Sequence, residues 1–248
     1  MNDPGQIRFT ISRISDLMYD MTLDPRIKSG SVIANFSVIK EDDLQSALDI
    51  FNQVSSIGLV VSPYFRILKE GESMGNMEVG EGEVGLATVC SITIDGVLLK
   101  SGVPTNLKGG GIVQVVKGRP MRFTHFIDYR YTTIDPLEVL MSQQQTSVMG
   151  VVKTGSGRIL ANLREAPMVA RDAIEKTLDL LTAAGFDGVL EVGEPNSDLF
   201  GVTLDRDHLG IAVIGGTNPL AAIQEAGISI RTGALSDLIE LSKMETIK

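Results

Sequence analysis

The sequence predicts an α+β protein made of two duplicated, ferredoxin-like (split β-α-β) lobes around a pseudo-twofold axis. Residues 30–36 recur as residues 157–163 with the same Ala-Asn pair, at an offset of 127. Farther along, residues 85–90 match residues 210–215 at an offset of 125. Two copies of a unit of about 75 residues are too few for a solenoid. We therefore expect paired lobes with a cleft between them.

Each copy is expected to read β-α-β-β-α-β, the order of a split β-α-β unit. Helices are indicated where apolar residues recur at helical spacing, and strands where short apolar runs lie between turn signals. The first copy is predicted to contain strand 32–38, helix 41–54, strand 59–68, a surface loop at 70–83, strand 86–92, helix 95–100 and strand 103–106. The second is predicted to contain strand 158–163, helix 168–183, strand 186–192, strand 209–214, helix 218–226 and strand 227–231. An alternative for residues 91–98 is a hairpin, because they alternate and contain an Asp-Gly pair.

Further elements are expected between and outside the copies. Alternating runs at 111–116 and 121–129 predict a hairpin. Asp135 and Pro136 open a helix that runs to about residue 144, as an N-cap and a first helical residue. The glycines at 109–111 are interpreted as a flexible link, and residues 232–244 as a final helix. The predicted division is 1–29, a linker or pairing helix; 30–106, the first repeat; 107–156, the connecting hairpin and helix; and 157–248, the second repeat.

Composition narrows the class of protein. The 248 residues carry a net charge of −9, and no Lys/Arg-rich run stands out, so direct contact with nucleic acid is not expected. No apolar run reaches the ~18 residues of a membrane span, and no secretory leader is recognisable. A single cysteine rules out an internal disulfide and favours a cytoplasmic protein.

Catalytic motifs are not recognisable. The two histidines, His125 and His208, are isolated, and no metal-ligand or cofactor motif is found. Cys90 is the one candidate nucleophile. The alternative to a binding protein is thus an enzyme that acts on a small anionic metabolite through Cys90, whereas a buried, unreactive thiol would favour the binding protein.

The best candidate site lies where each copy passes from a buried strand into a helix. Paired glycines let an anion approach the backbone, and free N–H groups at a helix start attract a carboxylate or phosphate. The two turns should face each other across the pseudo-twofold axis. Arg122 and Arg164 are further candidates, because a guanidinium group can bind the carboxylate of a ligand bidentately. The alternative is that either arginine pairs with an acidic residue of the chain itself. The predicted ligand-binding residues are Cys90, Ser91, Thr93, Gly215, Gly216, Thr217, Asn218, Arg122 and Arg164.

Four segments carry a resemblance to a known family: residues 85–98, 132–138, 159–165 and 215–219. With them, residues 7–245 resemble the regulatory domain of NrpR, the repressor of nitrogen-assimilation genes in methanogenic and related archaea. The resemblance implies a regulatory domain that senses 2-oxoglutarate as inducer. It also implies a winged-helix DNA-binding partner, as a chain or a domain. No winged-helix segment is recognisable before residue 7, so effector sensing and oligomer contacts are the expected roles.

Assembly is the last expectation. Residues 6–22 are predicted to form a helix whose apolar seam either lies on the core or pairs with another chain; the seam is Ile7, Ile11, Ile14, Met18 and Met21. We expect a homodimer or higher oligomer, built partly from this seam and from the 111–129 hairpin, because an uncovered strand edge needs a partner.

Overall fold

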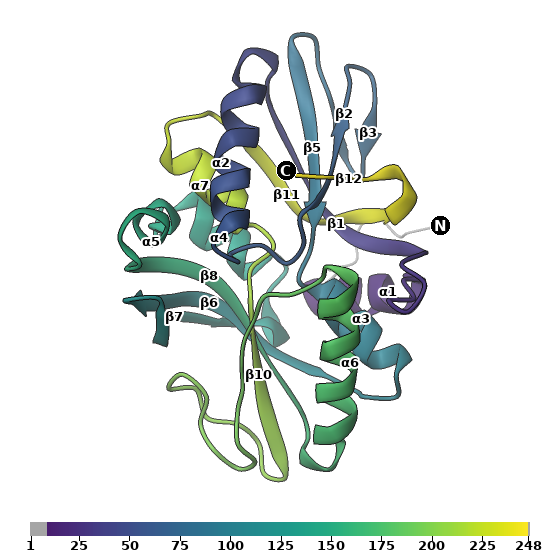
Figure 1. Ribbon diagram of the computed structural model, residues 1–248, viewed down its shortest axis with the longest axis vertical. Coiled ribbons are helices and arrows are strands. Elements are labelled where there is room, and N and C mark those ends of the chain that lie inside the picture. Colours follow the sequence, from purple (N-terminus) through teal and green to yellow (C-terminus); the bar gives the residue numbers. More distant parts are fainter. Residues whose placement is uncertain (1–8, 248) are drawn as a thin grey trace.

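The computed structural model describes residues 9–247, in which two five-stranded antiparallel sheets lie at opposite ends of the molecule (Figure 1). The α+β class with antiparallel sheets is confirmed. The strands are β1 (Ser31–Lys40), β2 (Tyr64–Leu68), β3 (Ser73–Met74), β4 (Met77–Glu78), β5 (Glu83–Val89), β6 (Asn106–Val116), β7 (Arg119–Asp128), β8 (Gly157–Pro167), β9 (Val189–Val192), β10 (His208–Ile214), β11 (Arg231–Glu240) and β12 (Glu245–Thr246). The helices are α1 (Thr10–Asp20), α2 (Leu44–Ser56), α3 (Ile92–Lys100), α4 (Pro136–Ser142), α5 (Val148–Thr154), α6 (Arg171–Ala184) and α7 (Asn218–Glu225).

The two repeats are interlocked rather than side by side. The first sheet has the order β11-β1-β5-β2-β12, and the second has the order β7-β6-β8-β10-β9. β6 follows the first repeat in sequence yet pairs with β8 of the second, and β11 follows the second repeat yet pairs with β1 of the first. The prediction that each repeat closes its own lobe is therefore wrong, because each gives its final strand to the other sheet.

The helices are exchanged together with the strands. Figure 1 shows α7 of the second repeat beside α2 of the first, and α3 of the first repeat beside α6 of the second; residue contacts link each of these pairs. The chain thus crosses from one lobe to the other twice, in the turn after β5 and in the turn after β10. These two turns are the ones in which the sequence predicts a site.

The N-terminal helix packs against its own chain. Ile14 and Met21 are fully buried, and Met18 is nearly so. A Cβ atom on Gly96 of α3 would lie 2.0 Å from the Met21 sulfur, so the Met21 side chain packs directly against the backbone of α3 at this glycine. Ile14, Met18 and Met21 therefore pack on the core, which is the first of the two predicted alternatives, and of the described seam only Ile11 is partly exposed. Ile7 lies outside the described residues.

The C-terminal prediction is also wrong, because residues 231–240 form strand β11 and not a helix. The apolar spacing of Leu235, Leu238 and Ile239 imitates a helix. The spacing arises from a bulge: the pairing of β11 with β1 shifts register opposite residues 34–36, and Leu235 adopts φ of +51° there. A bulge adds residues to one strand and breaks its period of two.

The glycine run at 109–111 lies inside the paired strand β6 and is not the flexible link that we predicted. A Cβ atom on Gly109 would lie 2.4 Å from the carbonyl oxygen of Ile127, and one on Gly111 would lie 2.2 Å from that of His125. These glycines let β7 approach β6 closely. The predicted hairpin is confirmed. The strand predicted at 103–106 is wrong, because residues 103–105 form no strand and β6 begins only at Asn106. The α5 helix and the β3–β4 hairpin were not predicted.

Within residues 9–247, no helix is both long and apolar enough to cross a bilayer.

Candidate ligand site at the chain crossing

The two strand-to-helix turns lie against each other at the crossing, as predicted. A Cβ atom on Gly216 would stand 2.5 Å from the Val89 carbonyl oxygen and 3.0 Å from the Cys90 Cα atom. A side chain at position 216 would therefore strike the backbone of the opposite turn. Glycine is required because the two repeats approach so closely here.

In each turn, one side chain hydrogen-bonds both the N–H and the carbonyl group of a single strand residue, and these two pairs of bonds match between the repeats. The Thr93 hydroxyl accepts a hydrogen bond from the Ile33 N–H (3.1 Å) and donates one to the Ile33 carbonyl (3.2 Å). In the other repeat, the Asn218 amide makes the same two contacts with the N–H (2.8 Å) and carbonyl (2.9 Å) of Leu160. Thr93 and Asn218 thus hold β1 and β8 in place. Asn218 is the first residue of α7, and its side chain binds β8 rather than capping the helix.

One repeat has a fully bonded asparagine at the crossing. The Asn162 side-chain N–H donates to the Ser91 hydroxyl at 2.7 Å, and its carbonyl oxygen accepts from the Tyr129 hydroxyl at 3.0 Å. Tyr129 is fully buried, and its hydroxyl also lies 3.2 Å from the Asp135 carboxylate. Ser91, a predicted site residue, is thereby engaged in a closed network. We call this side of the crossing the closed half.

The other repeat has an unsatisfied asparagine. Asn35 stands where Asn162 stands in the repeat and is 1 % exposed; its carbonyl oxygen accepts from the Leu235 N–H at 3.2 Å. Its side-chain Nδ2 has no hydrogen-bond partner within the described chain. The residue that faces Asn35 is Gly216 of the second repeat, which matches Ser91 at the offset of 125 and offers no hydroxyl. The nearby Thr217 hydroxyl is also buried and unpartnered. We call this side the open half.

These unsatisfied groups line a small cavity of about 10 Å³, together with Cys90, Ser91, Asn162 and Gly216. Roughly 10–15 Å³ is the space that one water molecule needs. Buried donors without partners are costly, so a cavity lined by two unpartnered polar groups indicates a place for a water molecule or another polar atom.

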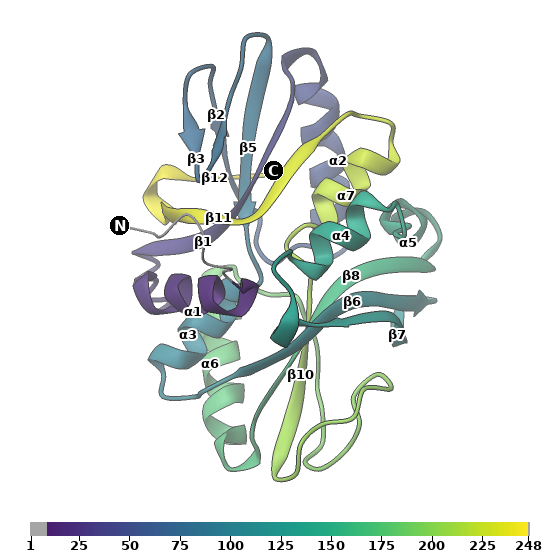
Figure 2. The same cartoon turned by 180° about the vertical axis from the view of Figure 1, so that it is seen from behind.

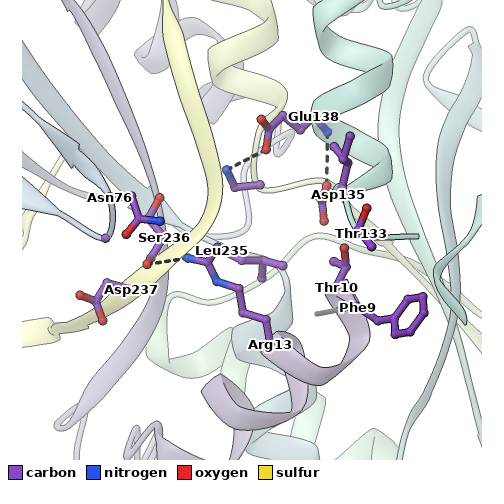
Figure 3. Close-up of a pocket in the computed structure, with 13 residues that line it drawn as sticks. Phe9, Thr10, Arg13, Asn76, Thr133, Asp135, Glu138, Leu235, Ser236 and Asp237 are labelled. Atoms are coloured by element: carbon purple, nitrogen blue, oxygen red, sulfur yellow. Dashed lines mark hydrogen bonds between the residues drawn. The ribbon is translucent and has the colours of Figure 1, made fainter. Parts of the chain in front are cut away.

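The cavity adjoins a cleft of about 660 Å³ that is open to solvent (Figure 3). Asp135, Ala234 and Leu235 line both spaces. In Figure 3, the Arg13 guanidinium reaches across the cleft to the Ser236 carbonyl, to which it donates at 3.0 Å. Leu235 itself is 2 % exposed, so the bulge of β11 separates the inner cavity from the outer cleft.

Acidic groups give the cleft its electrostatic character. Asp135 accepts hydrogen bonds from the N–H groups of Leu137 and Glu138 at the start of α4, which confirms the predicted cap. Burial nevertheless raises the pKa of the Asp135 carboxyl to about 6. Burial, followed by the nearby Asp135 charge, raises the pKa of the Tyr129 hydroxyl well above its ordinary value. The network is therefore neutral at Tyr129 and titratable at Asp135.

The geometry at Cys90 is not that of a nucleophile. Its thiol is buried, and burial raises its pKa to about 12. Nucleophilic cysteines depend on a thiolate with a depressed pKa. The enzyme alternative therefore loses its one candidate residue.

The two predicted arginines are not at the ligand cavity. Arg164 is fully buried and binds Asp95 of α3 bidentately, at 2.8 Å for Nε–Oδ1 and 2.5 Å for Nη2–Oδ2. It takes the alternative role of an internal ion pair across the two repeats. Arg122 lies exposed on β7, at a separate surface depression. Gly215 packs against Leu160 and Leu137 and has no free approach to a ligand.

Sequence reasoning missed several residues that line the site. Tyr129, Asp135 and Leu235 reach the crossing from the connecting segment and from β11, which no local pattern could place there. Asn35 did carry a signal, because it belongs to the Ala-Asn pair of the repeated segment that reveals the duplication. A repeat indicates architecture, however, and does not by itself predict a binding role.

The chain therefore consists of two interlocked α+β repeats that meet at a polar cavity, beside which the thiol of Cys90 is buried. Residues 7–246 match the NrpR regulatory domains NRD1 and 2, and the chain belongs to this family. It is 36% identical over 250 residues to the global nitrogen regulator NrpRI of Methanosarcina mazei, spanning 100% of this chain and 77% of that protein. It is 30% identical to the global nitrogen regulator NrpR of Methanocaldococcus jannaschii, spanning 98% of this chain and 41% of that protein.

A solved structure supports the same assignment. The crystal structure of a nitrogen repressor-like protein from Methanococcus jannaschii superimposes with a TM-score of 0.82 at 28% identity, covering 98% of this chain and 100% of that one. The family and its named relatives are nitrogen regulators, which makes this chain a regulatory protein and not an enzyme.

Proposed function

We propose that this chain is the effector-sensing domain of a nitrogen-responsive repressor and that it binds a small dianion, 2-oxoglutarate, at the chain crossing. In this proposal, each sheet with its exchanged strand is one ferredoxin-like lobe, and the effector binds between the lobes. The observation that carries the proposal is the pair of buried, unpartnered groups at the open half, Asn35 Nδ2 and Thr217 Oγ1. Both can donate a hydrogen bond to a carboxylate or keto oxygen.

The size of the cavity requires a second conformation. A space of about 10 Å³ cannot hold a molecule the size of 2-oxoglutarate, so the effector must displace Leu235 and join the cavity to the cleft. Leu235 suits this role because its φ of +51° is unfavourable for a side chain with a Cβ atom. A ligand that binds only the opened state shifts the population toward it.

Strand exchange gives such a movement a route to both lobes. The bulge at Leu235 belongs to β11, which comes from the second repeat and pairs in the first sheet. Opening the bulge therefore alters the strand that connects the two lobes, so both lobes are affected and not one alone. We propose that this change is passed to a winged-helix DNA-binding unit and to a second copy of the chain in a homodimer or higher oligomer.

A second effector class has its own support. Asp135, Glu138 and Asp237 line the cleft against the single guanidinium of Arg13. An acidic rim favours a ligand that carries an ammonium group, such as the zwitterion of glutamate or glutamine. For a dianion, the same rim makes binding depend on protonation of Asp135.

Calorimetric titration of the purified chain with 2-oxoglutarate tests the proposal, with succinate, glutamate and glutamine as comparison ligands. We expect saturable binding of 2-oxoglutarate in the micromolar to millimolar range and weaker binding of succinate, which lacks the keto oxygen. Preferential binding of glutamate or glutamine would favour the second class. The absence of heat and of a thermal shift for all four ligands would contradict both.

A further inference from the structure

One corner of the molecule collects basic side chains without acidic partners. The sequence contains no Asp or Glu between residues 106 and 127 or between residues 143 and 164, in a chain whose net charge is −9. These two segments form β6, most of β7, α5 and most of β8, which lie together in Figure 2. We define the basic corner by the residues Lys117, Arg119, Arg122, Lys153 and Arg158.

Strand pairing brings two of the arginines into one row. Gln114 of β6 lies directly opposite Arg122 of β7 on one side and Arg158 of β8 on the other. Directly paired residues have Cβ atoms about 5 Å apart, so the two arginines flank the glutamine at about 10 Å from each other. All three line a shallow depression of about 500 Å³ with Ser147, Ser156, Thr124 and His125.

The remaining cations adjoin this row. The β6–β7 turn is tied to the end of α5 by two hydrogen bonds, from the Gly118 N–H to the Gly155 carbonyl (2.7 Å) and from the Lys117 N–H to the Ser156 hydroxyl (3.0 Å). Lys117 and Arg119 on the turn are therefore close to Lys153 on the last turn of α5.

The guanidinium and ammonium groups of the basic corner are free to bind. No ion pair or side-chain hydrogen bond to any of the five is found across residues 9–247. Glu225, a carboxylate beside the corner, is already bonded to the N–H groups of Val148 and Met149 and to the Thr146 hydroxyl. Elsewhere the same structure pairs its arginines, as with Asp24, Asp128 and Glu83. An uncompensated row of like charges is destabilising in isolation and is relieved by an anion.

We infer that the basic corner binds the phosphate backbone of duplex DNA. Phosphate oxygens accept from Arg, Lys, Gln, Ser and Thr, which are the groups assembled here. The depression is open and the five cations extend beyond it, which suits an extended polyanion rather than an enclosed small molecule. The chain as a whole carries a net charge of −9, which repels DNA. Repulsion from charges farther away than the Debye length, about 10 Å at 0.1 M salt, is largely screened, so a local basic patch can still bind a phosphate backbone. In a transcription regulator, such contacts would add sequence-independent affinity beside an operator held by the winged helix.

Fluorescence anisotropy with a labelled DNA duplex of about 30 base pairs tests the inference over a salt range of about 25 to 150 mM KCl. For about four phosphate contacts, log K should fall with log[KCl] with a slope of about −3.6. The double variant Arg122→Ala with Arg158→Ala should lower the affinity at least about tenfold at the lowest salt and reduce the slope by about 2. The matched control is Lys40→Ala with Lys69→Ala, which removes the same charge from exposed positions near the first sheet.

Equal losses in both double variants, or no binding by the wild-type chain at the lowest salt, would overturn the inference. Two further arms identify what would replace it. A thermal shift with inorganic phosphate that depends on Arg122 and Arg158, without DNA binding, would indicate a free-phosphate site. A change in mass by light scattering in the arginine variant, without DNA binding, would indicate a protein interface. None of these outcomes bears on whether 2-oxoglutarate binds at the crossing.

Discussion

Asn162 and Asn35 occupy the same position of a duplicated motif, yet one is fully bonded and the other is not. Asn162 donates to Ser91 and accepts from Tyr129, whereas Asn35 faces a glycine where its counterpart faces a serine. The backbone around the two asparagines is held in the same way, because Thr93 hydrogen-bonds Ile33 as Asn218 hydrogen-bonds Leu160. Duplication therefore supplies a symmetric crossing, and the difference between Ser91 and Gly216 leaves the side-chain N–H of Asn35 without a partner in one half of it.

The two halves of the crossing also differ in their charged residues. Asp95 and Arg164 form a buried ion pair across the repeats. Their counterparts, at offsets of 125 and 127, are Leu220 and Ser37, which are both buried but cannot form an ion pair. One diagonal of the crossing is thus held by an ion pair and a polar network. The counterpart positions carry no charge, and the Ser37 hydroxyl instead lies 2.9 Å from the Thr232 hydroxyl.

The largest effect should come from breaking the ion pair. Arg164→Met leaves the Asp95 carboxylate buried without a partner, and the free energy of unfolding should fall by about 3–5 kcal/mol. The double variant Asp95→Leu with Arg164→Met, which copies Leu220 of the other repeat, should recover most of that loss. Urea denaturation followed by circular dichroism measures both. An equally unstable double variant would show that the site needs charge and that the two diagonals are not interchangeable.

The two asparagines should separate stability from binding. Asn162→Ala breaks two side-chain hydrogen bonds of the closed half and should cost about 2–4 kcal/mol of unfolding free energy. Asn35→Ala loses only the bond from the Leu235 N–H and should cost about 1 kcal/mol or less, because its N–H group was already unpaired. Chemical denaturation of the pair gives the difference directly. Equal costs would mean that the two halves are equally bonded in solution.

The raised pKa of Asp135 should make both stability and effector affinity depend on pH. Its pKa is raised to about 6, so the stability it contributes is fully present below its ordinary pKa and is lost as the pH rises through about 6. A dianion in the cleft should raise that pKa further. A rise of one unit, from about 6 to about 7, corresponds to a gain in affinity of about sixfold as the pH falls from about 7.5 to 5.5.

Titration calorimetry with 2-oxoglutarate at several pH values measures this dependence, and Asp135→Asn should remove it. An affinity that is unchanged with pH in the wild-type chain would indicate that the ligand does not sense Asp135. An affinity that falls with decreasing pH would favour the ammonium-bearing class of effector.

Much of this arrangement was open to sequence reasoning, because it rests on local patterns. The offsets of 127 and 125 revealed the duplication, and the helical spacing in residues 41–54 and 168–183 placed α2 and α6. The two turns were correctly expected to face each other. Cys90, Ser91, Gly216 and Thr217 do line the cavity.

The strand exchange could not be predicted in this way. No residue of β6 or β11 indicates which of the two sheets the strand joins. The backbone N–H and carbonyl groups of each strand could be paired equally well in the sheet of its own repeat or in that of the other repeat. Arg164 was misplaced for the same reason, because its partner Asp95 lies on a helix that crosses into the other lobe. The bulge at Leu235 imitated a helix because it broke the strand period. Long-range pairing decided each of these points.

The most direct test of the central claim, that the open half is a ligand site, is the substitution Thr217→Val. It removes the unpartnered hydroxyl with almost no change in shape, so stability should stay within about 1 kcal/mol of the wild type or rise slightly. Thr88→Val is the matched control, because the Thr88 hydroxyl is also buried and unpartnered but lies outside the cavity. By titration calorimetry, we predict that Thr217→Val weakens 2-oxoglutarate binding at least about tenfold, which corresponds to about 1.4 kcal/mol, while Thr88→Val binds like the wild type. Wild-type affinity in Thr217→Val would contradict the account.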